Sequence, residues 1–147
     1  MRDKTAFKQV FKIKGGDFIN AGESSIKIRN ILKEIGIEAN IIRRVAIAAY
    51  EAEMNVVMYA ERGLMNVIIN AKNIILRVED KGPGIEDIEL AMKPGYSTAT
   101  EEVREMGFGA GMGLPNIKKN SDHFDIRSVV GKSTRLEMVF NLNGTKD

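Results

Sequence analysis

The chain has 147 residues, of which 44% are hydrophobic and 29% are charged, enough for one domain with a core of its own. Its 22 lysines and arginines are nearly balanced by 20 aspartates and glutamates, which gives no support for nucleic-acid binding. The absence of cysteine excludes disulfides and thiolate catalysis, and the single histidine, His123, gives no support for a zinc site or a Ser-His-Asp triad. No stretch is apolar enough for a signal peptide or a membrane span, so we expect a cytoplasmic protein.

The first half of the chain predicts one strand and two helices. Residues 6–14 nearly alternate apolar and polar side chains, as in a half-buried strand that ends at Gly15. Residues 22–35 place isoleucine and leucine at helical spacing, and Gly36 is the expected end of that helix. A longer helix is expected over residues 38–61, with Arg62-Gly63 ending it. Its apolar stripe consists of Ile41, Val45, Ala48, Ala52 and Val56.

The second half predicts two hairpins separated by a glycine-rich loop. Residues 65–70 and 74–80 are expected to be strands joined by a tight turn, and the segment 81–84 breaks the pattern. The later elements are a short helix over 85–92, a loop over 93–113, a helix over 115–120, and strands over 124–130 and 134–142. Because hairpins outnumber crossovers, we expect one α+β domain over residues 1–147. It would be a two-layer sandwich whose mixed sheet is mostly antiparallel, with helices on one face.

A run of alternating glycines is the strongest chemical signal. Gly107, Gly109, Gly111 and Gly113 precede Leu114-Pro115-Asn116. Glycines let backbone N–H groups approach a ligand, and a helix that begins near Pro115 would point its free N–H groups and its positive end at the same place. The run therefore predicts a polyphosphate cradle, and the alternative is a flexible surface loop. A Rossmann loop is disfavoured, because its glycines follow the first strand of a βαβ unit.

A carboxylate followed by two glycines ends the strand predicted over residues 74–80. Asp80, two residues before Gly82 and four before Gly84, could accept a hydrogen bond from an exocyclic amine such as that of adenine. The alternative is a turn in which Asp80 only caps the backbone, and the segment alone does not separate the two.

The long helix carries polar residues beside its apolar stripe. Glu51 and Asn55 are four residues apart and therefore share a face. A carboxylate can polarise a hydroxyl and an asparagine oxygen suits Mg²⁺, although such a pair is more often an ordinary helix surface. Glu53 points to another side of the helix, where we expect it to be solvated.

These three segments, in this order, resemble the motifs of the GHKL superfamily, the Bergerat-fold ATP-binding proteins that include DNA gyrase, heat-shock protein 90, histidine kinases and MutL. Glu51 and Asn55 match the N box, the segment from Asp80 to Gly84 matches the G1 box, and the glycine run matches the G2 box. Thr134 matches a threonine that touches adenine in these proteins. The resemblance covers nearly the whole chain and implies binding of ATP or ADP with Mg²⁺.

Within the superfamily, the segment from Lys93 to Thr100 and the run from Arg104 to Ile117 resemble the anti-sigma-factor serine/threonine kinases, most closely the RsbT-type switch kinases. Such kinases phosphorylate serine or threonine of small STAS-domain proteins, and some also bind a sigma factor or a phosphatase. The resemblance therefore implies an ATP- and Mg-dependent serine/threonine kinase of a bacterial partner-switching pathway. One departure is Tyr59-Ala60, where many relatives have a His-Gly pair.

The resemblance also implies a role for each matched residue. Asn55 would hold Mg²⁺, Asp80 would bind adenine, and Glu51 would be the general base for the partner hydroxyl. Gly82, Gly84 and Thr134 would surround the base, while Gly107, Gly109, Gly111, Met112, Gly113 and Leu114 would close over the triphosphate. Arg104 is the candidate lid cation for the γ-phosphate, and a solvated loop arginine is an equal alternative.

Two other classes of function stay open on the sequence. A nucleotide-dependent binding module that sequesters a sigma factor or activates a phosphatase would need no general base, so Glu51 favours the kinase. A detached catalytic domain of a histidine kinase is less favoured, because the chain lacks a phosphoacceptor helix and His123 is expected to be a surface or half-buried loop residue. The identity of the partner protein and the formation of a homodimer are left open.

Overall fold

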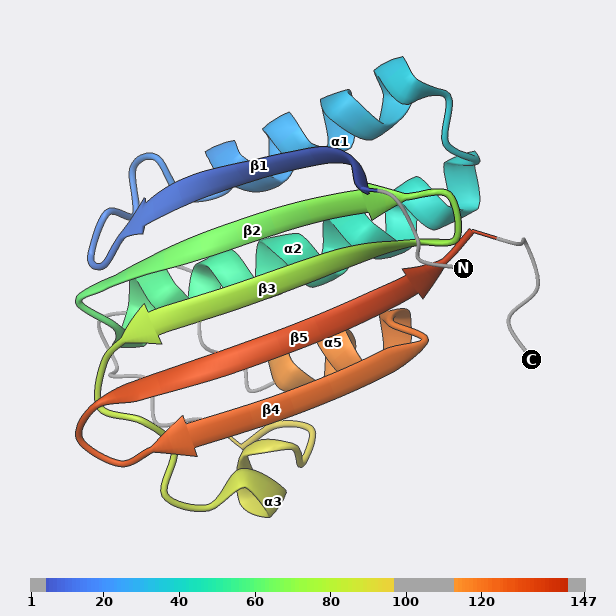
Figure 1. Ribbon diagram of the computed structural model, residues 1–147. Helices are drawn as coiled ribbons and strands as arrows, with labels where there is room; N and C mark the ends of the chain where they lie inside the picture. Colours follow the sequence, from blue (N-terminus) through green and yellow to red (C-terminus); the bar gives the residue numbers. More distant parts are fainter. Residues whose placement is uncertain (1–4, 97–112, 143–147) are drawn as a thin grey trace.

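A computed structural model describes residues 5–96 and 113–142 of the chain (Figure 1). The strands are β1 (Thr5–Lys14), β2 (Arg62–Asn70), β3 (Asn73–Lys81), β4 (His123–Val129) and β5 (Ser133–Asn141). They form one sheet in the order β1-β2-β3-β5-β4, and each neighbouring pair is antiparallel. The predicted α+β architecture is confirmed, and within the described residues the sheet is antiparallel throughout rather than mixed.

The helices form a second layer on one face of this sheet (Figure 1). They are α1 (Glu23–Ile35), α2 (Ala39–Tyr59) and α5 (Gly113–Asn120), and a short helix α3 (Ile88–Ala91) lies beyond the edge strand β4. Helix α2 is central, because it packs against α1 on one side and α5 on the other. None of the helices in the described residues is long and apolar enough to cross a membrane.

The sheet meets the helices through alternating apolar side chains of its central strands. Side chains of β3 and β5 that pair directly across the two strands are buried: Ile74 with Phe140, Leu76 with Met138, and Val78 with Leu136. Successive side chains of a strand point to opposite faces, so these six lie on the helix side. Val45, Ala48 and Ala52 of α2 are completely buried against them, at 0% exposure. The alternation that predicted the strands therefore also defines the core.

The end of α2 differs from its prediction. The helix ends at Tyr59, and Arg62-Gly63 begins β2 instead of ending the helix. Gly63 pairs with Asp80 across the sheet, and a Cβ at Gly63 would lie 2.9 Å from the methyl groups of Val56. This glycine is required by the close approach of a strand to a helix, a contact that local sequence does not reveal.

Three smaller differences concern the second half. The helix predicted over residues 85–92 is only Ile88–Ala91, because the Asp87 carboxylate accepts a hydrogen bond from the Leu90 N–H at 3.0 Å and caps the helix there. Helix α5 begins at Gly113, so Pro115 is its third residue, still within the first turn where no N–H is needed. His123, expected in a loop, is the exposed first residue of β4.

Candidate functional site

The first cluster of predicted site residues lies where α2 meets the beginning of α5. Glu51 and Asn55 are half-buried on α2, and the backbone of Gly113 lies against both of them. A Cβ at Gly113 would lie 3.2 Å from Asn55 Oδ1 and 3.7 Å from Glu51 Oε1. The glycine therefore brings the first turn of α5, with its free N–H groups and positive end, next to the N-box pair. Leu114 is buried and anchors this turn in the core.

Asn116 belongs to this cluster, although its sequence context predicted no role for it. Its Nδ2 donates a hydrogen bond to Glu51 Oε2 at 3.2 Å, between residues 65 positions apart in the chain. Asn116 follows the glycine run in the first turn of α5, which was the one available signal for it. The contact orients the carboxylate that the resemblance implies is the general base.

Contacts at the C-terminal end of α5 fix the position of the whole helix, including its first turn. Arg44 of α2 donates from Nε to the Asn120 carbonyl at 3.0 Å and forms an ion pair with Asp122 at 3.1 Å. The Asn120 side chain in turn donates to the Asn116 carbonyl at 2.8 Å. Because both charged side chains are largely buried, this anchor fixes α5 against α2 and thereby fixes the position of Asn116.

The second cluster lies at the end of β3. Asp80 pairs with Thr134 of β5, and its Oδ1 accepts a hydrogen bond from the Thr134 N–H at 3.1 Å. Burial raises the pKa of the Asp80 carboxyl above its ordinary value, and the hydrogen bond from the Thr134 N–H opposes that shift. The Thr134 hydroxyl lies 3.0 Å from Ser128 Oγ. Asp80 thus caps the backbone of Thr134, and its binding of adenine stays a prediction.

The glycines that follow Asp80 are required by packing. A Cβ at Gly82 would lie 3.1 Å from Ala60, at the end of α2, and 3.3 Å from Asp80 Oδ1. Gly84 has a φ of +73°, and a Cβ there would lie 2.5 Å from the Val129 carbonyl oxygen. Next to it, the Ile85 N–H donates to Ser128 Oγ at 2.7 Å. Ser128, which no sequence motif singled out, thus links this turn to Thr134.

Helix α2 relates the two clusters to each other. In the Asp80 cluster, Gly82 lies against Ala60, the residue that follows α2, and the Glu51 cluster includes Asn55 of α2, five residues earlier. In Figure 1, β3 and α2 end on the same side of the molecule, and α5 begins at its own end nearest that side. The other predicted site residues, Arg104, Gly107, Gly109, Gly111 and Met112, lie outside the described residues.

Glu53 was predicted to be solvated, and this prediction is wrong. Its side chain is only 3% exposed. The carboxylate accepts hydrogen bonds from the N–H groups of Gly22, Ser24 and Ser25, at 3.0, 3.3 and 3.0 Å, and from the Ser25 hydroxyl. Because a helix leaves its first N–H groups without partners, Glu53 completes the beginning of α1. Its role is structural.

The described residues fit a magnesium nucleotide. The amide oxygen of Asn55 is a hard ligand of the kind that Mg²⁺ prefers, and it faces the glycine backbone at the positive end of α5. At the other cluster, Asp80 can accept from the amine of a base. No group of three or more histidine, aspartate or glutamate side chains that could hold a metal is found in the described part of the chain.

Comparisons with known proteins show the family of the chain. Residues 24–140 match the family model of the histidine kinase-like ATPase domain. The chain belongs to this family. The matched range contains both clusters and all the strands except β1 and the last residue of β5.

The chain is similar to two groups of curated relatives. It is 33% identical over 115 residues to the serine/threonine-protein kinase RsbT of Bacillus subtilis (strain 168), with 76% of this chain and 80% of RsbT covered. It is also 33% identical over 104 residues to the anti-sigma F factor of Thermoanaerobacter sp. (strain X514), with 67% of this chain and 69% of the relative covered. The predicted superfamily and the predicted enzyme class, a protein serine/threonine kinase, are confirmed.

Solved structures share the fold of this histidine kinase-like ATPase. The RsbU and RsbW domains of a Mycobacterium tuberculosis protein match with a TM-score of 0.60 and 16% identity, over 91% of this chain and 32% of that chain. A chain of the SiaB-SiaC complex from Pseudomonas aeruginosa matches with a TM-score of 0.59 and 13% identity, over 92% of this chain and 89% of that chain. At these identities the likeness establishes the fold alone.

Proposed function

We propose that the chain transfers the γ-phosphoryl group of magnesium-bound ATP to a serine or threonine of a STAS-domain regulator, in a bacterial partner-switching pathway. The observation that carries this proposal is the Glu51 carboxylate. It lies against the first turn of α5, one helical turn from Asn55, and is oriented by Asn116 at 3.2 Å. A protein that only bound nucleotide would need no oriented carboxylate at this position.

Three described residues of the two clusters have a part in this reaction: Glu51, Asn55 and Asp80. Asp80, held by Thr134, accepts a hydrogen bond from the adenine amine and places the base. Asn55 would hold Mg²⁺ beside the beginning of α5, whose N–H groups favour the phosphates. When bound, the magnesium nucleotide supplies the phosphoryl group. Glu51 would accept the proton of the partner hydroxyl as that oxygen bonds to the γ-phosphorus, the bond from the γ-phosphorus to the β,γ-bridging oxygen breaks, and ADP leaves.

The substrate class is supported by the resemblance and by the relatives. The RsbT-type kinases, which the motifs of this chain resemble, act on STAS-domain proteins, and RsbT itself is similar to this chain over most of both lengths. The anti-sigma F factors among its relatives bear a name that points to a sigma factor as a second partner. Binding of a sigma factor is therefore the second candidate function, and a kinase can combine both.

The test is transfer of labelled phosphate from ATP to a purified STAS-domain regulator in the presence of Mg²⁺. Label is expected on the regulator and should disappear when its acceptor serine or threonine is replaced by alanine. Calorimetry with the nucleotide alone should give one binding site per chain. If the protein binds both ATP and the regulator but never transfers label, the kinase proposal fails and a non-catalytic binding module takes its place.

A further inference from the structure

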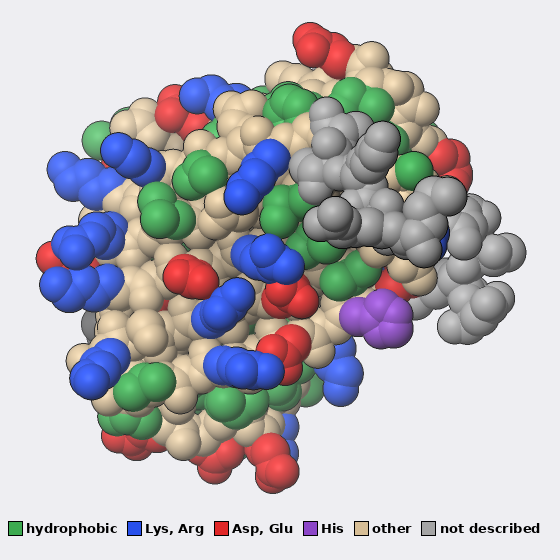
Figure 2. All heavy atoms as spheres, in the orientation of Figure 1, with side chains coloured by type: hydrophobic (Ala, Val, Ile, Leu, Met, Phe, Trp, Pro, Cys, Tyr) green, Lys and Arg blue, Asp and Glu red, His purple; other side chains and the backbone are tan. Residues whose placement is uncertain are grey.

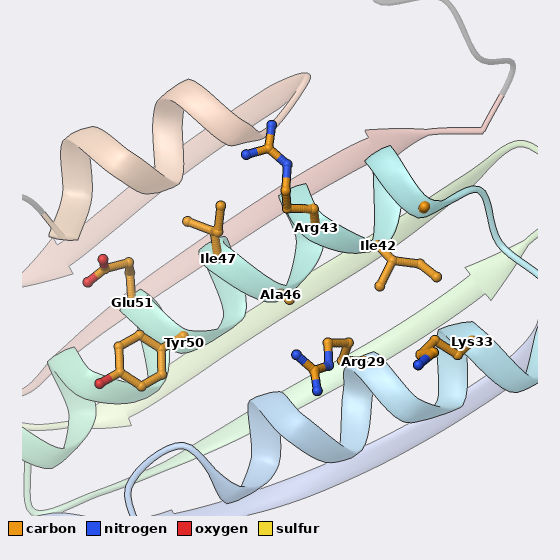
Figure 3. A pocket seen from close by; sticks show the side chains of 9 residues that line it. Arg29, Lys33, Ile42, Arg43, Ala46, Ile47, Tyr50 and Glu51 are labelled. Atoms are coloured by element: carbon orange, nitrogen blue, oxygen red, sulfur yellow. The ribbon is translucent and has the colours of Figure 1, made fainter.

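A groove runs between α1 and α2 on the side of the helix layer that faces away from the sheet (Figure 3). We call it the α1–α2 groove. Its lining includes Arg29 and Lys33 of α1 and Arg43, Ile47, Tyr50 and Glu51 of α2. Neither the nucleotide motifs nor the core accounts for this combination of exposed cations and apolar side chains.

The residues that line the groove are arranged in rows along the two helices. Arg29 and Lys33 are four residues apart on α1, and Arg43, Ile47 and Glu51 follow one another at the same spacing on α2. Residues at this spacing lie in one row along a helix. With a rise of 1.5 Å per residue, Arg43 lies about 12 Å from Glu51 along the axis. The groove therefore leads from a basic end to the proposed catalytic carboxylate.

The three cations of the α1–α2 groove have no carboxylate partner in the chain as described. Arg29, Lys33 and Arg43 are exposed, and none of them takes part in an ion pair within residues 5–96 and 113–142. Arg29 and Lys33 line the α1 wall and Arg43 lines the α2 wall, and Figure 3 shows the Arg43 guanidinium pointing away from α1. Their combined charge is therefore available to an anionic partner.

Cations without a carboxylate partner are not general for the molecule, as the face of the sheet that carries no helices shows. There Arg77 pairs with Glu137 at 2.6 Å, Arg127 with Asp125 at 3.2 Å and Arg135 with Glu79 at 3.4 Å. Figure 2 shows lysine and arginine side chains on this face interspersed with aspartate and glutamate. Much of its positive charge is thus neutralised within the chain, in contrast to that of the groove.

Apolar surface between the cations indicates what kind of partner fits. Ile47 is half-buried, and the Tyr50 ring is 40% exposed beside it. Aromatic and arginine side chains together are typical of the well-packed centre of protein interfaces. A free phosphate or a nucleic-acid backbone would use the cations and leave this apolar surface uncovered.

We propose that the α1–α2 groove docks an acidic segment of the phosphoacceptor protein and thereby brings its serine or threonine hydroxyl to Glu51. The inference rests on the proposed kinase function and adds to it the recognition site for the protein substrate. The docked segment carries an aspartate or glutamate about 12 Å from the hydroxyl, to pair with Arg43, and further acidic side chains that pair with Arg29 and Lys33. It also carries an apolar side chain that packs on Ile47 and Tyr50.

The test measures the KM for a purified STAS-domain regulator in the labelled-phosphate assay with Arg29→Glu and Arg43→Glu, one from each wall. Each should raise this KM about 10-fold, because reversing a charge opposes docking of an acidic segment. Nucleotide affinity should be unchanged. Lys27→Glu is the matched control, since Lys27 is an exposed cation of the same helix that does not line the groove. It should keep the wild-type KM.

The outcomes separate this proposal from the kinase function. If wild-type protein transfers label and the groove variants have the same KM as Lys27→Glu, the docking site is overturned while the kinase stands. If wild-type protein transfers no label, the kinase function fails. Calorimetric binding of the same regulator to the wild type and the variants then tests whether the groove is a docking site. Weaker binding by both groove variants than by Lys27→Glu then supports the docking site, and equal binding overturns it.

Discussion

Two glutamates on α2, only two residues apart, face different regions of the molecule. Glu51 faces α5 and the end of the α1–α2 groove, is half-buried, and within the described residues accepts one side-chain hydrogen bond, from Asn116. Glu53 faces the beginning of α1 and is surrounded by donors from Gly22, Ser24 and Ser25. A carboxylate whose lone pairs are already used by the protein holds structure together, and one that keeps free lone pairs can accept a substrate proton.

The largest expected effect is on catalysis at Glu51. Glu51→Gln keeps the shape of the side chain but removes the base, so phosphoryl transfer to the regulator should fall about 10²–10⁴-fold. Nucleotide affinity and the melting temperature should stay near wild type. Labelled-phosphate transfer, calorimetry and thermal unfolding of the same preparation provide the three readouts. Transfer at the wild-type rate would show that Glu51 is not the base.

At Glu53 we expect a loss of stability, whereas at Glu51 we expect a loss of catalysis. Glu53→Ala leaves the N–H groups of Gly22, Ser24 and Ser25 without their acceptor in a buried place and should lower the free energy of unfolding by about 3 kcal/mol. Urea unfolding measures this loss, with Glu51→Gln as the control on the same helix. A Glu53→Ala protein as stable as wild type would contradict the structural role assigned to this carboxylate.

A third substitution extends the comparison to Asp80, in the part of the site that is proposed to bind adenine. Asp80→Asn removes the charge that would accept the adenine amine, and nucleotide affinity should fall about 10–100-fold, the value of a hydrogen bond to a charged group. Because burial raises the pKa of Asp80, ionised Asp80 costs stability in the free protein, so this variant should unfold no more easily than wild type at neutral pH. Calorimetry and thermal unfolding without nucleotide check both statements.

Asn116 should show a smaller effect that separates positioning from binding. Asn116→Leu removes the donor to Glu51 Oε2 and should lower the rate of transfer about 3–10-fold, as expected for a single hydrogen bond. The affinity for nucleotide and the KM for the regulator should not change, and Asn116→Gln should recover part of the rate. A fall in nucleotide affinity instead would mean that Asn116 contacts the nucleotide and does not act through Glu51.

The smallest effect is a pH dependence of nucleotide binding. The pKa of Asp80 is raised above 3.8 by burial, so protonation begins at a higher pH than for an exposed aspartate. The protonated group is a poorer acceptor, and affinity should therefore decline as the pH is lowered through this pKa. The stability of the free protein should change in the opposite direction with pH. Because burial raises the pKa of Asp80, protonation of this group as the pH falls makes its contribution to the free energy of unfolding more favourable. Calorimetry between about pH 7 and about pH 4 measures the decline, which Asp80→Asn should abolish.

The sequence by itself determined the order and type of nearly all the elements. Alternation of apolar residues predicted the strands, and helical spacing predicted α1 and α2, because these periodicities reflect which side of an element is buried. The motifs predicted Asp80 with Thr134 and Glu51 with Asn55; in the structure Asp80 accepts from the Thr134 N–H, and Glu51 and Asn55 both lie beside Gly113. The roles assigned to Arg104 and the glycine run stay predictions.

Only the tertiary structure decided which polar side chains are structural and which are available. Helical spacing puts Glu51 and Glu53 on different sides of α2. The hydrogen-bond partners of Glu53, however, are 28 to 31 positions away in the chain, and the partner of Glu51 is 65 positions away. The α1–α2 groove likewise requires two helices to lie side by side before Arg29 and Arg43 can line the same groove. Local sequence encodes the periodicity of one element, whereas burial, hydrogen-bond partners and grooves arise between elements that pack only in the folded chain.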